Sequence, residues 1–365
     1  MRRPARTESS IVVKIGTSSL TGNDPGISRE AVRTVVSNVS AARAAGHPVV
    51  LVTSGAIAAG LPAMGLDRRP ADIPGLQVAA AVGQSRLMTL YTEEFEEVGI
   101  QVGQVLITRD VVARRDQYLH ARAALDRMLT IGVVPIVNEN DTVAVDEVRF
   151  GDNDRLAAIV SHLVGAGMLV LLTDTAGIYS GDPWISETAE LLSAVRHTDE
   201  ILDGLRASSS RGTFGSGGVA TKVAAARMAA WSGIPTVIAS AFVDDVVVRA
   251  ITGADIGTWV DPSDSGLPAR KLWIAFGSPS EGQLSVDEGA ARAICESGKS
   301  LLPVGVTDVD GEFQGGVAVE VRNEGRLIAK GLVSMSAAEI VGARGVHSSV
   351  AGGEVIHRDD LVVLT

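Results

Sequence analysis

Residues 11–19 read IVVKIGTSS, a β-branched run that ends in one glycine and three small hydroxyl residues. Such a run is typical of a strand buried on both faces of a parallel sheet. Lys14 is its only charge, and a buried lysine is costly unless it is paired or functional. Beside the backbone N–H groups that follow Gly16, its ammonium would suit phosphate oxygens. A lysine reaching water at a sheet edge would show the same pattern.

Similar runs alternate with alanine-rich stretches of helical spacing through the first 240 residues. We expect further strands at residues 49–53, 102–108, 133–137, 169–173 and 236–239, and helices at 28–45, 76–98, 117–130, 154–164 and 222–232. This alternation predicts a layered α/β domain with a mainly parallel sheet. Ligands bind beyond the carboxyl ends of the strands in such sheets, so the residues directly after each strand are candidate site residues.

The composition changes at residues 261–268, DPSDSGLP, which is typical of a linker. We therefore expect a first domain over residues 1–262, a linker over 263–270 and a second domain over 271–365. The second domain shows one helical stretch at 287–297 and short apolar runs at 317–321, 327–332 and 361–364. This pattern predicts a small, β-rich module.

Composition excludes several classes of protein. With 46% hydrophobic residues among 365, the chain is too apolar for disorder, and its net charge of −11 argues against duplex nucleic acid or an anionic membrane as the main partner. Cys295 is the only cysteine, and no Cys/His spacing suits zinc. Neither a signal peptide nor an apolar run of membrane-spanning length is present, so we expect a cytoplasmic protein.

A glycine-rich stretch, GTFGSGGVATK at residues 212–222, precedes the last helix expected in the first domain. Four glycines in seven residues let a backbone fold closely around a ligand, and Lys222 would open the helix. The stretch is not a Walker A loop, and it matches a dinucleotide fingerprint only weakly. A mobile glycine- and serine-rich loop is the alternative interpretation.

Three further polar clusters follow strands or open a helix. In GDND, residues 151–154, Asp154 could cap the next helix or hold the two lysines in place, while Asp152 and Asn153 could bind an ammonium and a carboxylate. The cluster NEND, 138–141, could bind an α-amino group, and Asp174 could orient a nucleotide or Mg²⁺, or form an Asx-turn. Together with the two lysines, these clusters indicate phosphoryl transfer without a covalent intermediate.

The motifs resemble those of the amino acid kinase family, in which they occur in this order: KIGTS (14–18), TSGA (53–56), VNEND (137–141), GDND (151–154), LTD (172–174) and GGVATK (217–222). Within that family the chain is most similar to members that phosphorylate L-glutamate. Residues 282–290, GQLSVDEGA, and 299–306, KSLLPVGV, resemble a PUA domain. The resemblance implies a three-layer αβα sandwich followed by a small β-rich domain.

The resemblance also implies the reaction. ATP, with Mg²⁺, would phosphorylate the side-chain carboxylate of L-glutamate to give L-glutamyl 5-phosphate, the first step of proline synthesis, with feedback inhibition by proline. Lys14 and Lys222 would neutralise charge in catalysis and Asp154 would organise both lysines. Glutamate would be held by Ser54, Asn138, Asp141, Asp152 and Asn153. ATP would contact Lys14, Gly16, Thr173, Asp174, Ser216, Gly217, Gly218, Val219, Ala220, Thr221 and Lys222. No metal ligand from the protein is implied, because the nucleotide would carry Mg²⁺.

Two alternatives remain open at this point. One is another member of the same family, acting on aspartate, acetylglutamate, carbamate or UMP; the other is an RNA-binding PUA protein with a vestigial kinase domain. From residue 271 onward the chain has 8 basic and 13 acidic residues and only three aromatics, which makes RNA binding unfavourable. Where related domains carry an acid after the glycine near Gly315, this chain has Gly316. A homo-oligomer, dimer or tetramer, is expected for such an enzyme.

Overall fold

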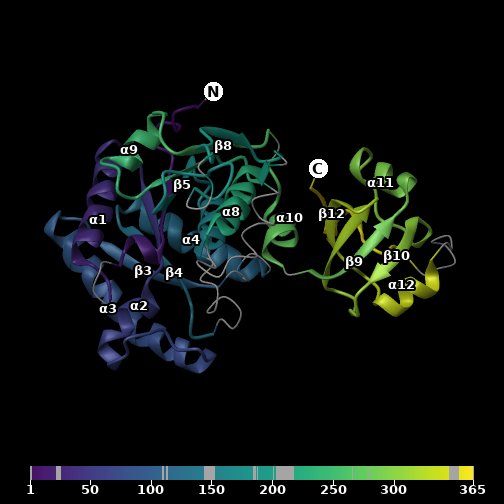
Figure 1. Ribbon diagram of the computed structural model, residues 1–365, viewed down its shortest axis with the longest axis horizontal. Helices are drawn as coiled ribbons and strands as arrows, with labels where there is room; N and C mark the ends of the chain where they lie inside the picture. The colour runs from purple at the N-terminus through teal and green to yellow at the C-terminus, as the bar shows by residue number, and fades with distance from the viewer. Residues whose placement is uncertain are drawn as a thin grey trace. The chain divides into compact units, whose positions relative to one another are not determined.

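The structure, a computed structural model, describes residues 2–21, 26–108, 111, 114–143, 153–183, 186, 188–199, 201–202, 218–264, 266–278, 280–344 and 353–364. It contains two compact units, Met1–Gly266 and Leu267–Thr365 (Figure 1). The boundary between the two units lies between Gly266 and Leu267. None of the described helices is long and apolar enough to cross a lipid bilayer.

The described part of the first unit is built on an eight-stranded sheet in the order β3-β4-β2-β1-β5-β7-β8-β6. Its strands are β1 (Ile11–Ile15), β2 (Val49–Thr53), β3 (Val102–Ile107), β4 (Val134–Glu139), β5 (Met168–Thr173), β6 (Ala194–Arg196), β7 (Thr236–Ser240) and β8 (Thr258–Asp261). Neighbouring strands are parallel except β7 and β8, which are antiparallel. The predicted mainly parallel α/β sheet is confirmed, and β1 lies in its interior, so Lys14 is not an edge residue.

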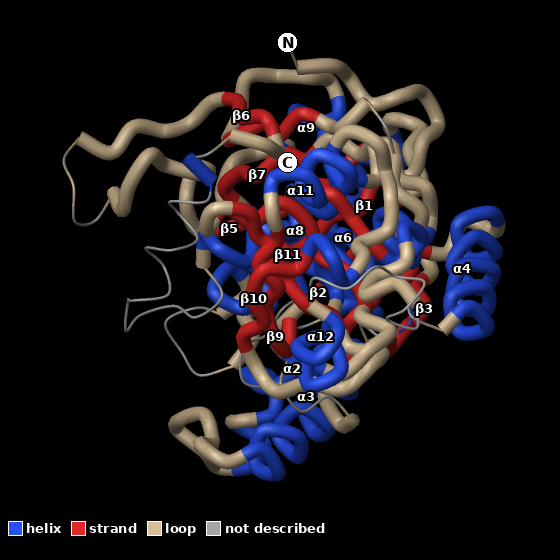
Figure 2. Tube along the Cα trace, turned by 90° about the vertical axis from the view of Figure 1, so that its right-hand side faces the viewer, coloured by secondary structure: helices blue, strands red, loops and turns tan. Residues whose placement is uncertain are grey.

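Helices cover both faces of this sheet (Figure 1; helices are blue and strands red in Figure 2). They are α1 (Arg29–Ala44), α2 (Ala56–Gly60), α3 (Ile73–Glu97), α4 (Arg115–Thr130), α6 (Asn153–Leu163), α8 (Val219–Trp231) and α9 (Val246–Ile251), with 3₁₀ turns η1 (Thr17–Ser19) and η2 (Pro62–Met64). Side chains of α1, α3 and α9 share one apolar core with one face of the sheet, while α6 packs on α8 and on β1. Ser28 caps α1, accepting a hydrogen bond from Ala31 N at 3.3 Å.

The alternation of side chains along β1 directs Lys14 to one layer. Ile11, Val13 and Ile15 belong to the core shared with α1, α3 and α9. Because successive side chains of a strand point to opposite faces, Lys14 points to the layer formed by α6 and α8. The sequence of this one strand therefore places an ammonium group next to the starts of those two helices.

The second unit has a five-stranded sheet among its described residues, in the order β10-β9-β11-β12-β13. Its elements are α10 (Ala269–Leu272), the π-helical turn η4 (Trp273–Gly277), β9 (Ser280–Val286), α11 (Glu288–Cys295), η5 (Pro303–Gly305), β10 (Val306–Asp310), β11 (Ala318–Asn323), β12 (Arg326–Leu332), α12 (Ala337–Ala343), η6 (Arg358–Asp360) and β13 (Leu361–Val363). Side chains of this sheet and of α11 and α12 form the unit's own core. The predicted β-rich module is thus confirmed.

Candidate active site

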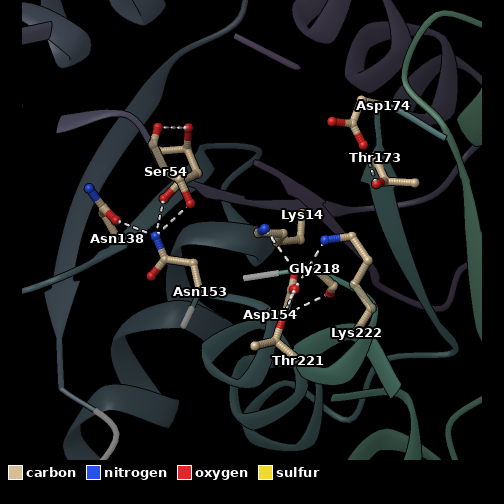
Figure 3. A network of polar contacts seen from close by, with 11 residues as sticks. Lys14, Ser54, Asn138, Asn153, Asp154, Thr173, Asp174, Gly218, Thr221 and Lys222 are labelled. Atoms are coloured by element: carbon tan, nitrogen blue, oxygen red, sulfur yellow. Dashed lines mark hydrogen bonds and ion pairs between the residues drawn. The ribbon is translucent and has the colours of Figure 1, made fainter. Parts of the chain in front are cut away.

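Asp154 holds two lysines at the carboxyl edge of the sheet. Lys14 Nζ lies 2.7 Å from Asp154 Oδ1, and Lys222 Nζ lies 3.2 Å from Asp154 Oδ2 (Figure 3). The side chains of Lys14, Asp154 and Lys222 are 5%, 3% and 14% exposed. Thr221 Oγ1 also donates a hydrogen bond to Asp154 Oδ2, at 2.6 Å. We call these four residues the lysine cluster.

The expected helix starts need correction here. α6 begins at Asn153, so Asp154 lies in the first turn and its carboxylate binds the lysines and Thr221. Similarly, α8 begins at Val219, so Lys222 lies one turn inside the helix that it was expected to open. Both side chains project from the N-terminal turn of a helix, which is the end where backbone N–H groups favour anions.

The charge state of Asp154 follows from its surroundings. Burial acts to raise the pKa of Asp154, but the positive charges of Lys14 and Lys222, with the hydrogen bonds from Lys14 and Thr221, outweigh burial and lower the pKa to about 2. The carboxylate is therefore ionised at neutral pH. With two ammonium groups, the lysine cluster carries one net positive charge.

Gly16 lies beside the lysine at the end of β1. A Cβ atom at residue 16 would lie 3.4 Å from Lys14 Nζ, in ordinary van der Waals contact with the ammonium group. The turn η1 follows directly, so small residues surround this position. On the neighbouring strand β5, Thr173 is buried and Asp174 is exposed, and Thr173 Oγ1 donates to Asp174 Oδ1 at 3.2 Å.

A second cluster, the amide cluster, consists of Ser54, Asn138 and Asn153 (Figure 3). Asn153 Nδ2 lies within 3.0 Å of three acceptors: Thr53 O at 2.8 Å, Ser54 Oγ at 3.0 Å and Asn138 Oδ1 at 2.8 Å. All three members of the cluster are buried. Because Asn153 and Asp154 are consecutive, the start of α6 joins the amide cluster to the lysine cluster.

The expected site residues are placed as follows. Lys14, Asp154, Thr221 and Lys222 contact one another, as do Ser54, Asn138 and Asn153. Gly218 is the N-cap of α8, and its carbonyl oxygen lies 3.2 Å from Thr221 Oγ1; Val219 and Ala220 follow it in the first turn. Asp141 lines a cavity of about 280 Å³ behind the end of β4, with Gln84, Glu139 and Asn140 among the other lining residues. Asp152, Ser216 and Gly217 lie outside the described residues.

Two residues of α3 that no motif indicated support the amide cluster. Gln84 Oε1 accepts a hydrogen bond from Asn138 Nδ2 at 2.7 Å. Tyr91 Oη lies 2.8 Å from Thr53 Oγ1, which donates to Ser54 O, so the phenol is the donor to Thr53. Burial raises the pKa of Tyr91 and keeps that proton in place. The spacing of seven residues puts Gln84 and Tyr91 on one face of the helix. That these two residues support the site can be recognised only when the strands that they contact are known.

The second unit has a cavity of its own, of about 770 Å³. Residues of α11, the chain after it and the C-terminal turn line this cavity, including Asp287, Lys299, Glu354, His357 and Arg358. Charges of both signs therefore border it.

Comparison with known proteins agrees with this architecture. The model of the amino acid kinase family matches residues 9–240, and that of the PUA domain matches residues 282–351. The chain is 43% identical over 373 residues to a glutamate 5-kinase from Marinomonas sp. (strain MWYL1), with 100% of both chains covered. It is 45% identical over 364 residues to the glutamate 5-kinase of Streptomyces avermitilis and 46% identical over 367 residues to that of Frankia casuarinae, each covering 97% of this chain and 96% of the relative.

The motif order, the lysine cluster on an αβα sheet and the full-length relatives all point the same way. The chain is a kinase that belongs to the amino acid kinase family, among the glutamate 5-kinases with a C-terminal PUA domain.

Proposed function

We propose that this enzyme transfers the γ-phosphoryl group of ATP to the side-chain carboxylate of L-glutamate, giving L-glutamyl 5-phosphate for proline synthesis. The observation that carries the proposal is the adjacency of the lysine cluster and the amide cluster at the start of α6. One cluster suits phosphate oxygens and the other suits an uncharged or zwitterionic polar ligand. An ATP-dependent amino acid kinase needs both.

The chemistry requires little beyond charge and position. A carboxylate is ionised and nucleophilic at neutral pH, so no general base is needed; the barrier lies in bringing two anions together. Lys14 and Lys222 would neutralise the oxygens of the transferring group, and Asp154 would fix the distance between the two ammonium groups. Preorganised charges of this kind act mainly on the transition state.

On the amino-acid side, the hydrogen bonds of Asn153 restrict its role. Its Nδ2 group already faces three acceptors, whereas Asn153 Oδ1 is buried and has no hydrogen-bond partner among the described residues. Asn153 would therefore accept from the ammonium group of glutamate, together with the carboxylate of Asp141. Ser54 accepts from Asn153, so its hydroxyl proton would be available to a carboxylate of the substrate. Asn138 and Asp152 would complete this side.

On the nucleotide side, Gly16 and the first turn of α8 would present backbone N–H groups to the phosphates, and Thr173 and Asp174 would meet the nucleotide. Gly217 and Ser216 precede that turn and would share the role. Among the described residues of the phosphate end, both oxygens of Asp154 are engaged by lysines and Thr221. Mg²⁺ would therefore be carried by ATP itself.

We also propose how the chain is divided into domains, how it assembles and how it is regulated. Residues 1–262 would form the catalytic domain, 263–270 the linker and 271–365 the PUA domain, in a cytoplasmic homo-oligomer, dimer or tetramer. Proline would inhibit the enzyme by feedback. The second domain would serve regulation or assembly and would not bind RNA.

The deciding experiment traps the acyl phosphate with hydroxylamine. The protein is incubated with ATP and Mg²⁺ and with glutamate, aspartate or acetylglutamate in parallel, and the hydroxamate is measured. We expect product with glutamate only, and less product when proline is added. Product with aspartate alone would overturn the substrate assignment, and an unchanged rate at saturating proline would remove the feedback proposal.

A further inference from the structure

Gln84 is a polar residue buried in the middle of α3, outside the residues assigned above. It is 9% exposed, and its Oε1 accepts a hydrogen bond from Asn138 Nδ2 at 2.7 Å. Its position is set by the preceding residue: a Cβ at Gly83 would lie 1.7 Å from Ala56 O, so only glycine lets α3 pack this closely on α2. Since Ala56 follows the Ser54–Gly55 turn, this packing holds Gln84 against the amide cluster.

The direction of the hydrogen bonds through these amides is fixed. Asn138 Oδ1 accepts from the backbone N–H of Glu139 at 2.9 Å and from Asn153 Nδ2 at 2.8 Å. The backbone N–H can only donate, so the oxygen of Asn138 must face it and the NH₂ group must face Gln84. The oxygen of Gln84 is therefore turned toward Asn138, and its own NH₂ group points away from Asn138.

That NH₂ group is a buried donor in need of an acceptor. Gln84 Nε2 has no hydrogen-bond partner within the part of the chain that the structure describes. A buried polar group without a partner is costly, so a ligand or an ordered water is expected to supply the acceptor. Gln84 borders the cavity of about 280 Å³ that Asp141 and Glu139 also line.

The charges of this cavity suggest what the donor binds. Its lining side chains include the carboxylates of Glu139 and Asp141, and no lysine or arginine is among those that the structure describes. The ammonium group of an amino acid is favoured there, but its α-carboxylate needs a donor that is not a cation. A neutral amide fulfils that requirement without neutralising the acids that hold the ammonium.

We propose that Gln84 is a positioning residue for the amino-acid substrate: its oxygen fixes the Asn138 amide, and its NH₂ group donates a hydrogen bond to the substrate's α-carboxylate. This inference rests on the proposed function, in which glutamate is the phosphoryl acceptor. It assigns to α3 a direct part in recognising the amino acid.

Three variants separate the two roles of Gln84. Gln84→Met removes both the acceptor and the donor with little change in size. Gln84→Glu keeps an oxygen for Asn138 and removes the donor. Gln101→Glu makes the same charge change at an exposed glutamine before β3 and is the matched control. For each, kcat and the KM values for glutamate and ATP are measured in the hydroxamate assay, together with thermal unfolding.

We expect both Gln84 variants to raise the KM for glutamate by about 10- to 100-fold, the usual effect of losing a hydrogen bond to a charged group. The KM for ATP should stay within about twofold of wild type, as should every constant of Gln101→Glu. Gln84→Glu should retain more of kcat than Gln84→Met, because Asn138 stays fixed. If Gln84→Met unfolds, the KM for glutamate of Gln84→Glu alone tests the proposal.

4-Aminobutanoate provides an independent readout, because it is glutamate without the α-carboxylate. Removing the donor should lower kcat/KM for glutamate and leave kcat/KM for 4-aminobutanoate nearly unchanged. A wild-type KM for glutamate in Gln84→Glu would overturn the proposal. So would a loss of kcat/KM that is equal for glutamate and 4-aminobutanoate, or a loss that is equal for glutamate and ATP. Absence of hydroxamate with wild-type protein and glutamate would instead count against the proposed function.

Discussion

Asp154 compensates one of the two positive charges of the lysine cluster, which is the proposed phosphate end of the site. Two ammonium groups face its two oxygens, so one positive charge remains uncompensated when the site is ready for a phosphate group. Breaking a buried ion pair by removing one partner is usually destabilising because it leaves a buried charge. Here the loss of one lysine leaves a neutral pair, whereas the loss of Asp154 leaves two like charges. Removal of a lysine is therefore the cleaner test of function.

Lys222→Ala should lower kcat by about 10³-fold or more, the size of effect seen when a cation that stabilises a transferring phosphoryl group is lost. The fold should remain, because Lys14 still pairs with Asp154 at 2.7 Å. Steady-state kinetics and the unfolding temperature check both statements. Lys299→Ala, on the second unit, is the matched control and should behave as wild type. Near-normal turnover in Lys222→Ala would remove this lysine from the mechanism.

Residues differ in how much of their placement can be predicted from sequence. Lys14 stands out as a charge within an apolar strand, and Asp154 and Lys222 stand out in polar or glycine-rich motifs, so the sequence indicates them directly. Gln84 gives no such signal, because its partner Asn138 lies 54 residues further along the chain. A polar residue inside a helix is usually a surface residue. Only the structure shows that Gln84 is buried, where α3 packs on α2 and Gln84 is hydrogen-bonded to Asn138 of β4.

At the scale of elements, α2 and α3 are held together by two glycines. A Cβ at Gly60 would lie 2.0 Å from Ala79 O, and one at Gly83 would lie 1.7 Å from Ala56 O. The helix backbones therefore touch, and no side chain separates them. This contact fixes the start of α2, and with it the Ser54 end of β2, relative to α3.

Gly83→Ala should destabilise the protein by about 2 kcal/mol or more, because the added methyl group would force the backbones of α2 and α3 apart. Chemical unfolding of the full chain measures this. Gly342→Ala in α12 is the matched control: a Cβ there meets nothing within 4 Å, so the same substitution should be neutral or stabilising by up to about 1 kcal/mol. Equal stability of Gly83→Ala and wild type would show that the close contact is not needed.

Long apolar elements were predictable and short ones were not. The strands β1 and β2 have the expected bounds, and β3, β4, β5 and β7 differ by one or two residues. Most of these strands are apolar runs buried in a parallel sheet; the exception is β3, which contains the exposed Gln104. By contrast β6 has three residues, of which only the middle one is buried, and β9 and β10 contain many polar residues. The helix α12 carries a readable signal, the Ser336–Glu339 capping box, that the apolar pattern alone does not reveal.

At the scale of the whole molecule, acidity is shared by both parts. From residue 271 onward the chain contains 13 acidic and 8 basic residues, and its aromatic residues there are Trp273, Phe276 and Phe313. Phe313 is buried in the core of the second unit and is not available for stacking on a base. Affinity for RNA depends on phosphate neutralisation and base stacking, which this unit offers only sparingly.

We therefore expect no specific retention of tRNA by the full-length protein in a filter-binding measurement at about 0.1 M salt. A known tRNA-binding protein serves as the positive control, and unlabelled tRNA as the competitor. Submicromolar retention that the competitor abolishes would contradict this expectation and would direct attention to the cavity bordered by Lys299, His357 and Arg358.

The two clusters meet at consecutive residues, Asn153 in one and Asp154 in the other. Strand β1 and helix α8 supply the rest of the proposed phosphate end, and β2, β4 and α3 supply the proposed amino-acid end. If the proposed roles hold, the preference for one phosphoryl acceptor over another would change in evolution through residues of three elements, while the elements that hold Lys14 and Lys222 stay as they are. For an engineer, a library confined to α3 and the ends of β2 and β4 would then sample new acceptors and leave Lys14 and Lys222 untouched.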